Sequence, residues 1–114
     1  MPEDLPDSYP TKAVSLDFTK RYEAAFGPET RNAFAGYSYD ATLLLNAAVP
    51  EAMKKAKPGT PEFRAALRDA LEHVHNVVGT HGVYNLSPTN HNGLDERARV
   101  LVEVKNGEWK LMKQ

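Results

Sequence analysis

The sequence has no cysteine and almost no net charge, and each absence excludes a class of protein. Without cysteine, the chain has neither a disulfide framework nor a thiolate metal site. Its 14 basic and 15 acidic residues give a formal net charge of −1 at pH 7. Proteins that bind nucleic acid or an anionic membrane surface usually carry an excess of basic residues, so we expect no nucleic acid among the partners. The composition, 41% hydrophobic and 25% charged over 114 residues, instead fits one soluble globular unit.

The first ten residues have neither a basic region nor an apolar run. They therefore show no signal peptide, and we expect any export signal of a parent protein to lie upstream. Three prolines stand among acidic residues here and leave little to bury, which predicts an extended connector over residues 1–10. We divide the single unit 1–114 into this connector, a helical part at 11–78, and a strand and hairpin at 79–114.

Apolar residues recur with a period of 3.6 through the helical part, which predicts three helices. The first spans residues 11–26 and the second residues 36–56, where Pro50 should kink the helix. The third spans residues 61–78, and Thr60 suits its N-cap position. The second helix is apolar most of the way round, so it needs cover on nearly every side.

A period of two replaces the helical period near the C-terminus. A short strand is expected at residues 83–86. Through residues 99–105, three valines (Val100, Val102 and Val104) alternate with Arg99, Leu101, Glu103 and Lys105. Asn106 and Gly107 form the strongest two-residue hairpin signal available, and residues 108–112 return as the partner strand. The fold class is therefore α/β, with three helices followed by a short strand and a C-terminal β-hairpin.

The apolar second helix and the isolated hairpin both lack cover within 114 residues. An isolated two-stranded hairpin is marginal in water, and an uncovered strand edge tends to pair with another chain. We therefore expect the chain on its own to form a homodimer that buries these faces.

Motifs that would indicate catalysis or a metal site are incomplete. Residues 36–40 (GYSYD) lack the last glycine of the G-x-S-x-G nucleophile elbow, and no strand precedes them. The spacing of the four histidines does not suit a metal site, and no Gly-rich phosphate loop occurs. The sequence predicts no catalytic residue, no metal site and no cofactor.

Aromatic residues gather where the second helix begins, and they are the candidate ligand contacts. Phe34 and Tyr37 lie close to N-terminal N–H groups that have no partner inside the helix. Such a place suits a ligand that carries both a carboxylate and an apolar group. Packing in a core or an interface is the alternative interpretation of the same aromatic residues.

Five short motifs follow one another in an order that resembles a known family. They are LPDS at 5–8, F-x-x-x-Y at 18–22, GYSYDA at 36–41, GTPEFR-x-ALRDALE at 59–72 and SP-x-x-H-x-G at 87–93. Together with the closing hairpin, they resemble the C-terminal third of periplasmic substrate-binding proteins. The chain is similar to the branched-chain amino acid type of ABC-transporter receptor, a type I "Venus flytrap" whose two α/β lobes are joined by three crossover strands.

The resemblance implies a non-enzymatic solute-binding protein of an ABC importer, located in the periplasm. It implies that residues 5–10 follow a hinge crossing, and that the three helices pack on the sheet of one lobe. It also implies that Phe34 and Tyr37 lie near the interlobe cleft, where the parent would bind a small apolar or aromatic carboxylate or amino acid. An ABC permease would be the second partner.

About two thirds of the usual chain of such a receptor is absent, including the Ser/Thr loops that usually hold the ligand's carboxylate. We therefore expect the 114 residues alone to bind ligand far more weakly than the parent, or not at all. Two alternatives stay open: a ligand-sensing domain of the same fold in a regulator or receptor, and an unrelated small enzyme or interaction module.

Overall fold

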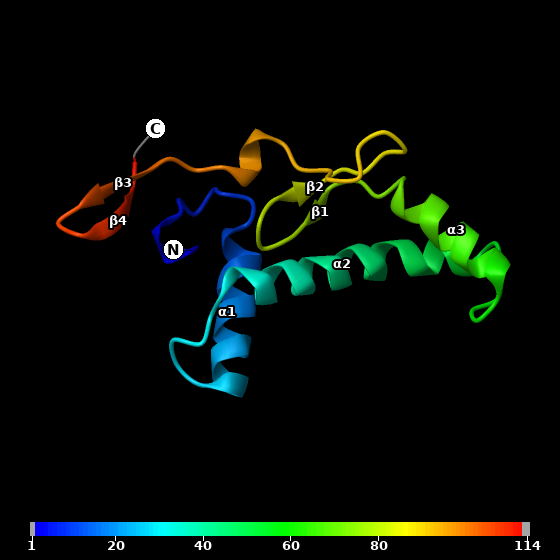
Figure 1. Ribbon diagram of the computed structural model, residues 1–114, viewed down its shortest axis with the longest axis horizontal. Coiled ribbons are helices and arrows are strands. Elements are labelled where there is room, and N and C mark those ends of the chain that lie inside the picture. Colours follow the sequence, from blue (N-terminus) through cyan, green and yellow to red (C-terminus); the bar gives the residue numbers. More distant parts are fainter. Residues whose placement is uncertain (1, 113–114) are drawn as a thin grey trace.

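A computed structural model describes residues 2–112 of the chain. Figure 1 shows an elongated arrangement, with the third helix at one end and the C-terminal hairpin at the other. In chain order, the elements are η1 (Pro2–Asp4), α1 (Lys12–Phe26), α2 (Ala33–Met53), α3 (Pro61–Leu71), β1 (Val77–Val78), β2 (Val83–Tyr84), η2 (Glu96–Ala98), β3 (Val102–Lys105) and β4 (Glu108–Leu111). The predicted α/β fold class, with more helix than strand, is confirmed.

The boundaries of α2 differ from prediction at both ends. α2 begins at Ala33 rather than at residue 36, because the Asn32 side chain accepts a hydrogen bond from the Ala35 N–H at 2.9 Å and caps the helix there. It runs through Pro50 as one helix and ends at Met53. The proline lies in the last turn, where few backbone hydrogen bonds remain to be lost.

The third helix was predicted to reach residue 78, and this was wrong. α3 ends at Leu71, and residues 77–78 instead form strand β1, which pairs antiparallel with β2. Asn76 has a φ of 56°, a left-handed conformation that ends any continuation of the helix. The apolar periodicity continued past the end of the helix because Val74 and Val77 still pack in the core, Val77 from strand β1.

The core lies between α2, α3 and the segment that follows α3. Ala48, Val74, Tyr84 and Leu86 are buried there, and partly buried leucines from α2 and α3 surround them. At the start of α3, the Thr60 hydroxyl accepts from the Phe63 N–H at 3.1 Å, which confirms the predicted cap. This packing fixes the segment at residues 77–84 against α2.

The C-terminal hairpin forms as the sequence predicts. β3 and β4 pair antiparallel from Val102 opposite Leu111 to Lys105 opposite Glu108. Asn106 and Gly107 have φ values of 52° and 79°, as a two-residue turn with positive φ at both central positions requires. Trp109 is 73% exposed, so the apolar side chains of the hairpin have little cover in this chain.

Candidate functional site

Asp40 is the most deeply buried large side chain of the described residues, although it lies in the apolar helix α2. The residue as a whole is 1% exposed. Oδ1 accepts a hydrogen bond from the Thr80 N–H at 2.6 Å, and Oδ2 accepts from the His81 N–H at 3.0 Å. The Tyr84 hydroxyl donates to Oδ2 at 2.8 Å. The carboxylate therefore holds the turn between β1 and β2 against α2.

The side chains of Asp40 and Tyr84 leave no space for a larger residue at position 79. A Cβ atom on Gly79 would lie 2.6 Å from Asp40 Cγ and 2.7 Å from Tyr84 Cε2, so only glycine fits at this position. Burial, together with the hydrogen bond to Asp40, raises the pKa of Tyr84 well above its usual value. The phenol therefore remains a hydrogen-bond donor across the physiological pH range.

His81 extends from the turn that Asp40 holds. Its Nδ1 atom lies 3.3 Å from Asp40 Oδ2 and 2.8 Å from Thr80 Oγ1. The imidazole stacks on the Tyr37 ring, with 3.8 Å between centroids and 18° between planes. Its Cε1 would lie 2.6 Å from a Cβ atom on Gly36, so the ring rests against the first turn of α2. Four neighbours thus fix the position of this ring.

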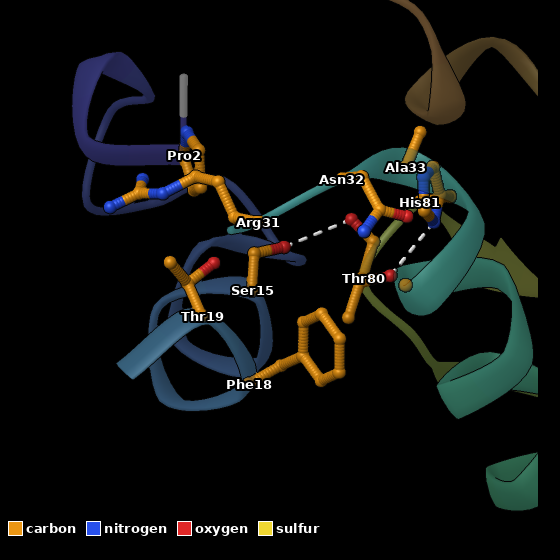
Figure 2. A pocket seen from close by; sticks show the side chains of 10 residues that line it. Pro2, Ser15, Phe18, Thr19, Arg31, Asn32, Ala33, Thr80 and His81 are labelled. Carbon is orange, nitrogen blue, oxygen red and sulfur yellow. Dashed lines mark hydrogen bonds between the residues drawn. The ribbon is translucent and has the colours of Figure 1, made fainter. Parts of the chain in front are cut away.

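A pocket of about 310 Å³ opens beside His81, between α1, the start of α2 and the turn at residues 80–81. Figure 2 shows its wall, in which the Ser15 hydroxyl of α1 donates to the Thr80 carbonyl at 2.9 Å. The lining is mostly apolar and includes Phe18 and Ala33. An apolar cavity with a few polar groups on its wall is the usual form of a small-molecule site.

Arg31 also lines this pocket, but its guanidinium group is engaged on the protein. It bonds Glu23 through Nε at 2.8 Å and Nη2 at 3.0 Å, and Glu3 through Nη1 at 2.6 Å. Hydrogen bonding to Arg31 lowers the pKa of both carboxyl groups. Arg31 therefore ties α1 to η1 and is not a free cation that could bind a ligand's carboxylate.

The start of α2 supplies unpaired donors next to the pocket. Asn32 and Ala33 lie in its lining. The Asn32 side chain caps the Ala35 N–H, which leaves the N–H groups of Ala33 and Phe34, at the first two helical positions, without an intrahelical partner. The positive end of the helix dipole makes this a favourable place for an anion.

The two predicted ligand contacts lie near this pocket, but neither lines it. Phe34 is 80% exposed on the first turn of α2, and Tyr37 is 51% exposed. Tyr37 reaches the site indirectly, through its stacking on His81. Both aromatic side chains are thus open to contact by another segment or by a ligand.

Sequence reasoning missed Asp40, His81 and Ser15 as members of one cluster. A signal was present, because Asp40 is the one charged residue in an otherwise uncharged stretch from residue 32 to 50. His81 stands between Gly79 and Gly82, which indicates a tight turn. The contact between the two segments could not be predicted, because Asp40 and His81 lie 41 positions apart in the sequence.

The Asp40–His81 pair does not form a catalytic triad. In a triad, the carboxylate and the nucleophile bond opposite nitrogens of the imidazole. Here Asp40 and the Thr80 hydroxyl both face Nδ1. Within residues 2–112, no hydroxyl group bonds His81 Nε2.

The same residues contain no group of three His, Cys, Asp or Glu side chains that could hold a metal ion. None of the described helices is long and apolar enough to span a membrane.

Comparisons with known proteins give no match to a family model and none to a curated protein. Solved structures do match. An extracellular ligand-binding receptor from Rhodopseudomonas palustris is 46% identical with a TM-score of 0.86, over 98% of this chain and 31% of that one. Two receptors from R. palustris HaA2 are 44% and 41% identical, with TM-scores of 0.87 and 0.82.

This chain spans about a third of the length of each of these receptors. Over that third, the fold is that of a periplasmic binding protein, and the resemblance seen in the sequence is confirmed at this level. The match extends from the N-terminal connector to the hairpin, because 98% of the chain is aligned.

Proposed function

We propose that this chain is part of the solute-binding component of an ABC importer, of the branched-chain amino acid type. The whole protein captures a small apolar or aromatic carboxylate or amino acid in a cleft between two lobes and delivers it to a permease in the membrane. The observation that carries the proposal is the match to extracellular ligand-binding receptors, at 46% identity over 98% of the chain. The proposed location is the periplasm, and the proposed role is binding without catalysis.

The geometry at the start of α2 supports the proposed ligand class. Two N–H groups without intrahelical partners suit a carboxylate, and the exposed rings of Phe34 and Tyr37 offer flat apolar surface nearby. Aromatic rings provide contact area at a small cost in side-chain entropy. An aromatic or branched acid satisfies both features, and we therefore keep Phe34 and Tyr37 as the proposed ligand contacts.

A ligand-sensing domain of a regulator or receptor is the alternative function, because it would have the same fold. The genome distinguishes the two: a signal peptide and a neighbouring permease gene favour the importer, and fusion to a signalling domain favours the sensor. An unrelated enzyme or interaction module is disfavoured by the match to binding receptors along the whole chain.

Calorimetry on the full-length protein tests the site. Tyr37→Ala should weaken binding of an aromatic acid by about 1–3 kcal/mol, the range for loss of a buried aromatic contact. Phe34→Ala should weaken it in the same direction. Phe26→Ala is a matched control, because Phe26 is also an exposed helical aromatic residue but lies at the far end of α1. Unchanged affinity in both α2 variants would refute the site assignment.

For the 114 residues alone, we propose a homodimer that covers the exposed apolar side chains of α2 and the hairpin. Light scattering at micromolar concentration should give twice the monomer mass. A folded monomer would contradict this proposal without affecting the function proposed for the whole protein.

A further inference from the structure

Asparagine is followed by glycine at two places in the chain, residues 92–93 and 106–107. Glycine has no side chain to keep its backbone nitrogen away from the preceding carboxamide, so this pair favours an internal reaction. The glycine nitrogen, once it has lost its proton, attacks the asparagine Cγ atom. A bond forms between N and Cγ, the Cγ–Nδ2 bond breaks, and ammonia leaves a five-membered succinimide ring. Water then opens the ring, at Cγ to give aspartate or at the main-chain carbonyl carbon to give isoaspartate.

The folded chain restrains both reacting groups at Asn92. The Gly93 N–H, which contains the attacking nitrogen, donates to Asn90 Oδ1 at 3.0 Å, and the Gly93 carbonyl accepts from the Asn85 N–H at 2.8 Å. Asn92 Oδ1 accepts from the Leu94 N–H at 3.3 Å, which holds the carboxamide. Gly93 is also buried. These hydrogen bonds must break before the nitrogen can reach Cγ.

The second pair has none of these restraints. Asn106 and Gly107 form the turn between β3 and β4, at the end of the molecule opposite α3 (Figure 1), and both residues are exposed. In the described part of the chain, no hydrogen bond involves the Asn106 side chain or the Gly107 N–H. A Cβ atom on Gly107 would meet no atom within 4 Å, so the space around the nitrogen is open.

The turn itself is the remaining barrier at Asn106. Its φ values of 52° and 79° belong to the closed hairpin, and the backbone must rotate before the Gly107 nitrogen faces Cγ. A two-stranded hairpin is marginal in water, and such elements open locally while the rest of the protein stays folded. The reaction therefore proceeds from the open turn, at a rate that the local stability of the hairpin sets.

We propose that Asn106 is a modification site, which converts spontaneously to aspartate and isoaspartate while Asn92 stays intact. The overall reaction consumes one water molecule and releases one ammonia molecule, so it needs no enzyme, and it is independent of any bound solute. The isoaspartyl product adds a methylene group to the backbone of the turn. A two-residue turn fixes the register of Lys105 opposite Glu108, so the longer turn weakens the pairing of β3 with β4.

Peptide mapping of the full-length protein tests the proposal. The protein is incubated at neutral pH and digested under mildly acidic conditions, which stop the reaction, and mass spectrometry then follows the exchange of NH₂ for OH at each asparagine. Asn106 should convert about tenfold or more faster than Asn92, the ratio that one or two net hydrogen bonds provide. Equal rates, or a faster reaction at Asn92, would overturn the proposal. A synthetic peptide of residues 105–110 gives the unrestrained rate, and an intact Asn106 in the protein after this peptide has fully converted would overturn it too.

Two variants of the loop at residues 87–93 test why Asn92 is protected. Asn90→Ala removes the acceptor of the Gly93 N–H, so conversion at Asn92 should accelerate about fivefold, and conversion at Asn106 should not change. Thr89→Ala is the matched control, because its hydroxyl contacts Ser87 rather than Gly93, and it should leave both rates unchanged. An unchanged rate at Asn92 in Asn90→Ala would refute the protective role of Asn90.

The effect on the hairpin is measured on the modified protein itself. Ion exchange separates the modified from the unmodified form after incubation, because aspartate and isoaspartate each add a negative charge. Amide hydrogen exchange at β3 and β4 should be faster in the isoaspartyl form than in the unmodified form, and unchanged at Thr80. Asn106→Gln is the control, since the longer side chain does not form the five-membered ring, and its exchange should not change during the same incubation. Equal exchange in the isoaspartyl and unmodified forms would refute the effect on the pairing of β3 with β4.

Discussion

The two ends of the molecule are stabilised in opposite ways. In the helical part, residues 12–94, the decisive contacts join segments far apart in sequence: Asp40 of α2 bonds the backbone at residues 80 and 81 and the Tyr84 hydroxyl. In the hairpin, residues 102–111, the contacts are local. Each strand pairs with its neighbour across a two-residue turn, and Trp109 remains largely exposed.

This difference shows that one buried polar group, the Asp40 carboxylate, stabilises the turn at residues 79–82 but not the hairpin. A buried acceptor with several donors cannot be removed without leaving those donors unsatisfied, so the turn at residues 79–82 depends on Asp40. The hairpin has no comparable centre. Val102, Trp109 and Leu111 of the hairpin line a pocket together with residues of the N-terminal segment. The hydrogen bonds from that segment reach only the connector before the hairpin: the Tyr9 hydroxyl donates to the Arg97 carbonyl at 2.7 Å and to the Arg99 carbonyl at 3.3 Å.

The largest expected effect follows from removing that acceptor. Asp40→Ala leaves the Thr80 N–H, the His81 N–H and the Tyr84 hydroxyl without their partner in a buried site. We expect a loss of about 3 kcal/mol or more in the free energy of unfolding, since each unsatisfied buried group costs about 1–3 kcal/mol. Urea denaturation of the full-length protein, followed by circular dichroism, measures this loss.

Tyr84→Phe is the control for that experiment. It removes one donor and leaves the two backbone hydrogen bonds to Asp40 in place, so the loss should be only about 1 kcal/mol. Similar losses for the two variants would mean that the Tyr84 hydroxyl, rather than the carboxylate, stabilises the turn. In that case the contrast between the two ends of the molecule would need a different explanation.

The same contrast explains what could be predicted from the sequence. The hairpin was predicted nearly to the residue, because Asn106-Gly107 and the alternating valines are local signals. The three helices were also predicted, from apolar periodicity and from the Thr60 cap. The end of α3 was missed, because Val74 and Val77 keep facing the core after the helix has ended. A period of apolar residues reports burial and does not by itself report the backbone conformation.

The candidate site was predicted only in part, for a related reason. The free N–H groups and the aromatic side chains at the start of α2 could be inferred from one stretch of chain. The pocket could not, because its wall combines Ser15 of α1, the start of α2, and Thr80 with His81. Those segments meet only in the folded chain. The charged Asp40 within an apolar helix was the one sign that a partner segment existed.

The smallest expected effects come from alanine substitutions at two glycines that both have a positive φ. Gly59, between α2 and α3, has a φ of 91°, and Gly107, in the hairpin turn, has a φ of 79°. A Cβ atom at either position would meet no atom within 4 Å, so alanine adds backbone strain without a clash. That strain should cost about 1 kcal/mol at each site. The two substitutions therefore differ only in what the strained turn connects.

Gly59→Ala should lower the stability of the whole helical part, because the turn that it strains connects two helices that pack on each other. Gly107→Ala should act only on the hairpin, because the ladder can open at its tip while the helical part stays folded. Amide hydrogen exchange in the full-length protein measures both effects. With Gly59→Ala, exchange should accelerate at the amides of Thr80 and Asn85, and with Gly107→Ala only at β3 and β4. Faster exchange at Thr80 in Gly107→Ala would show that the hairpin and the helical part unfold together, so that the two ends of the molecule are not independent.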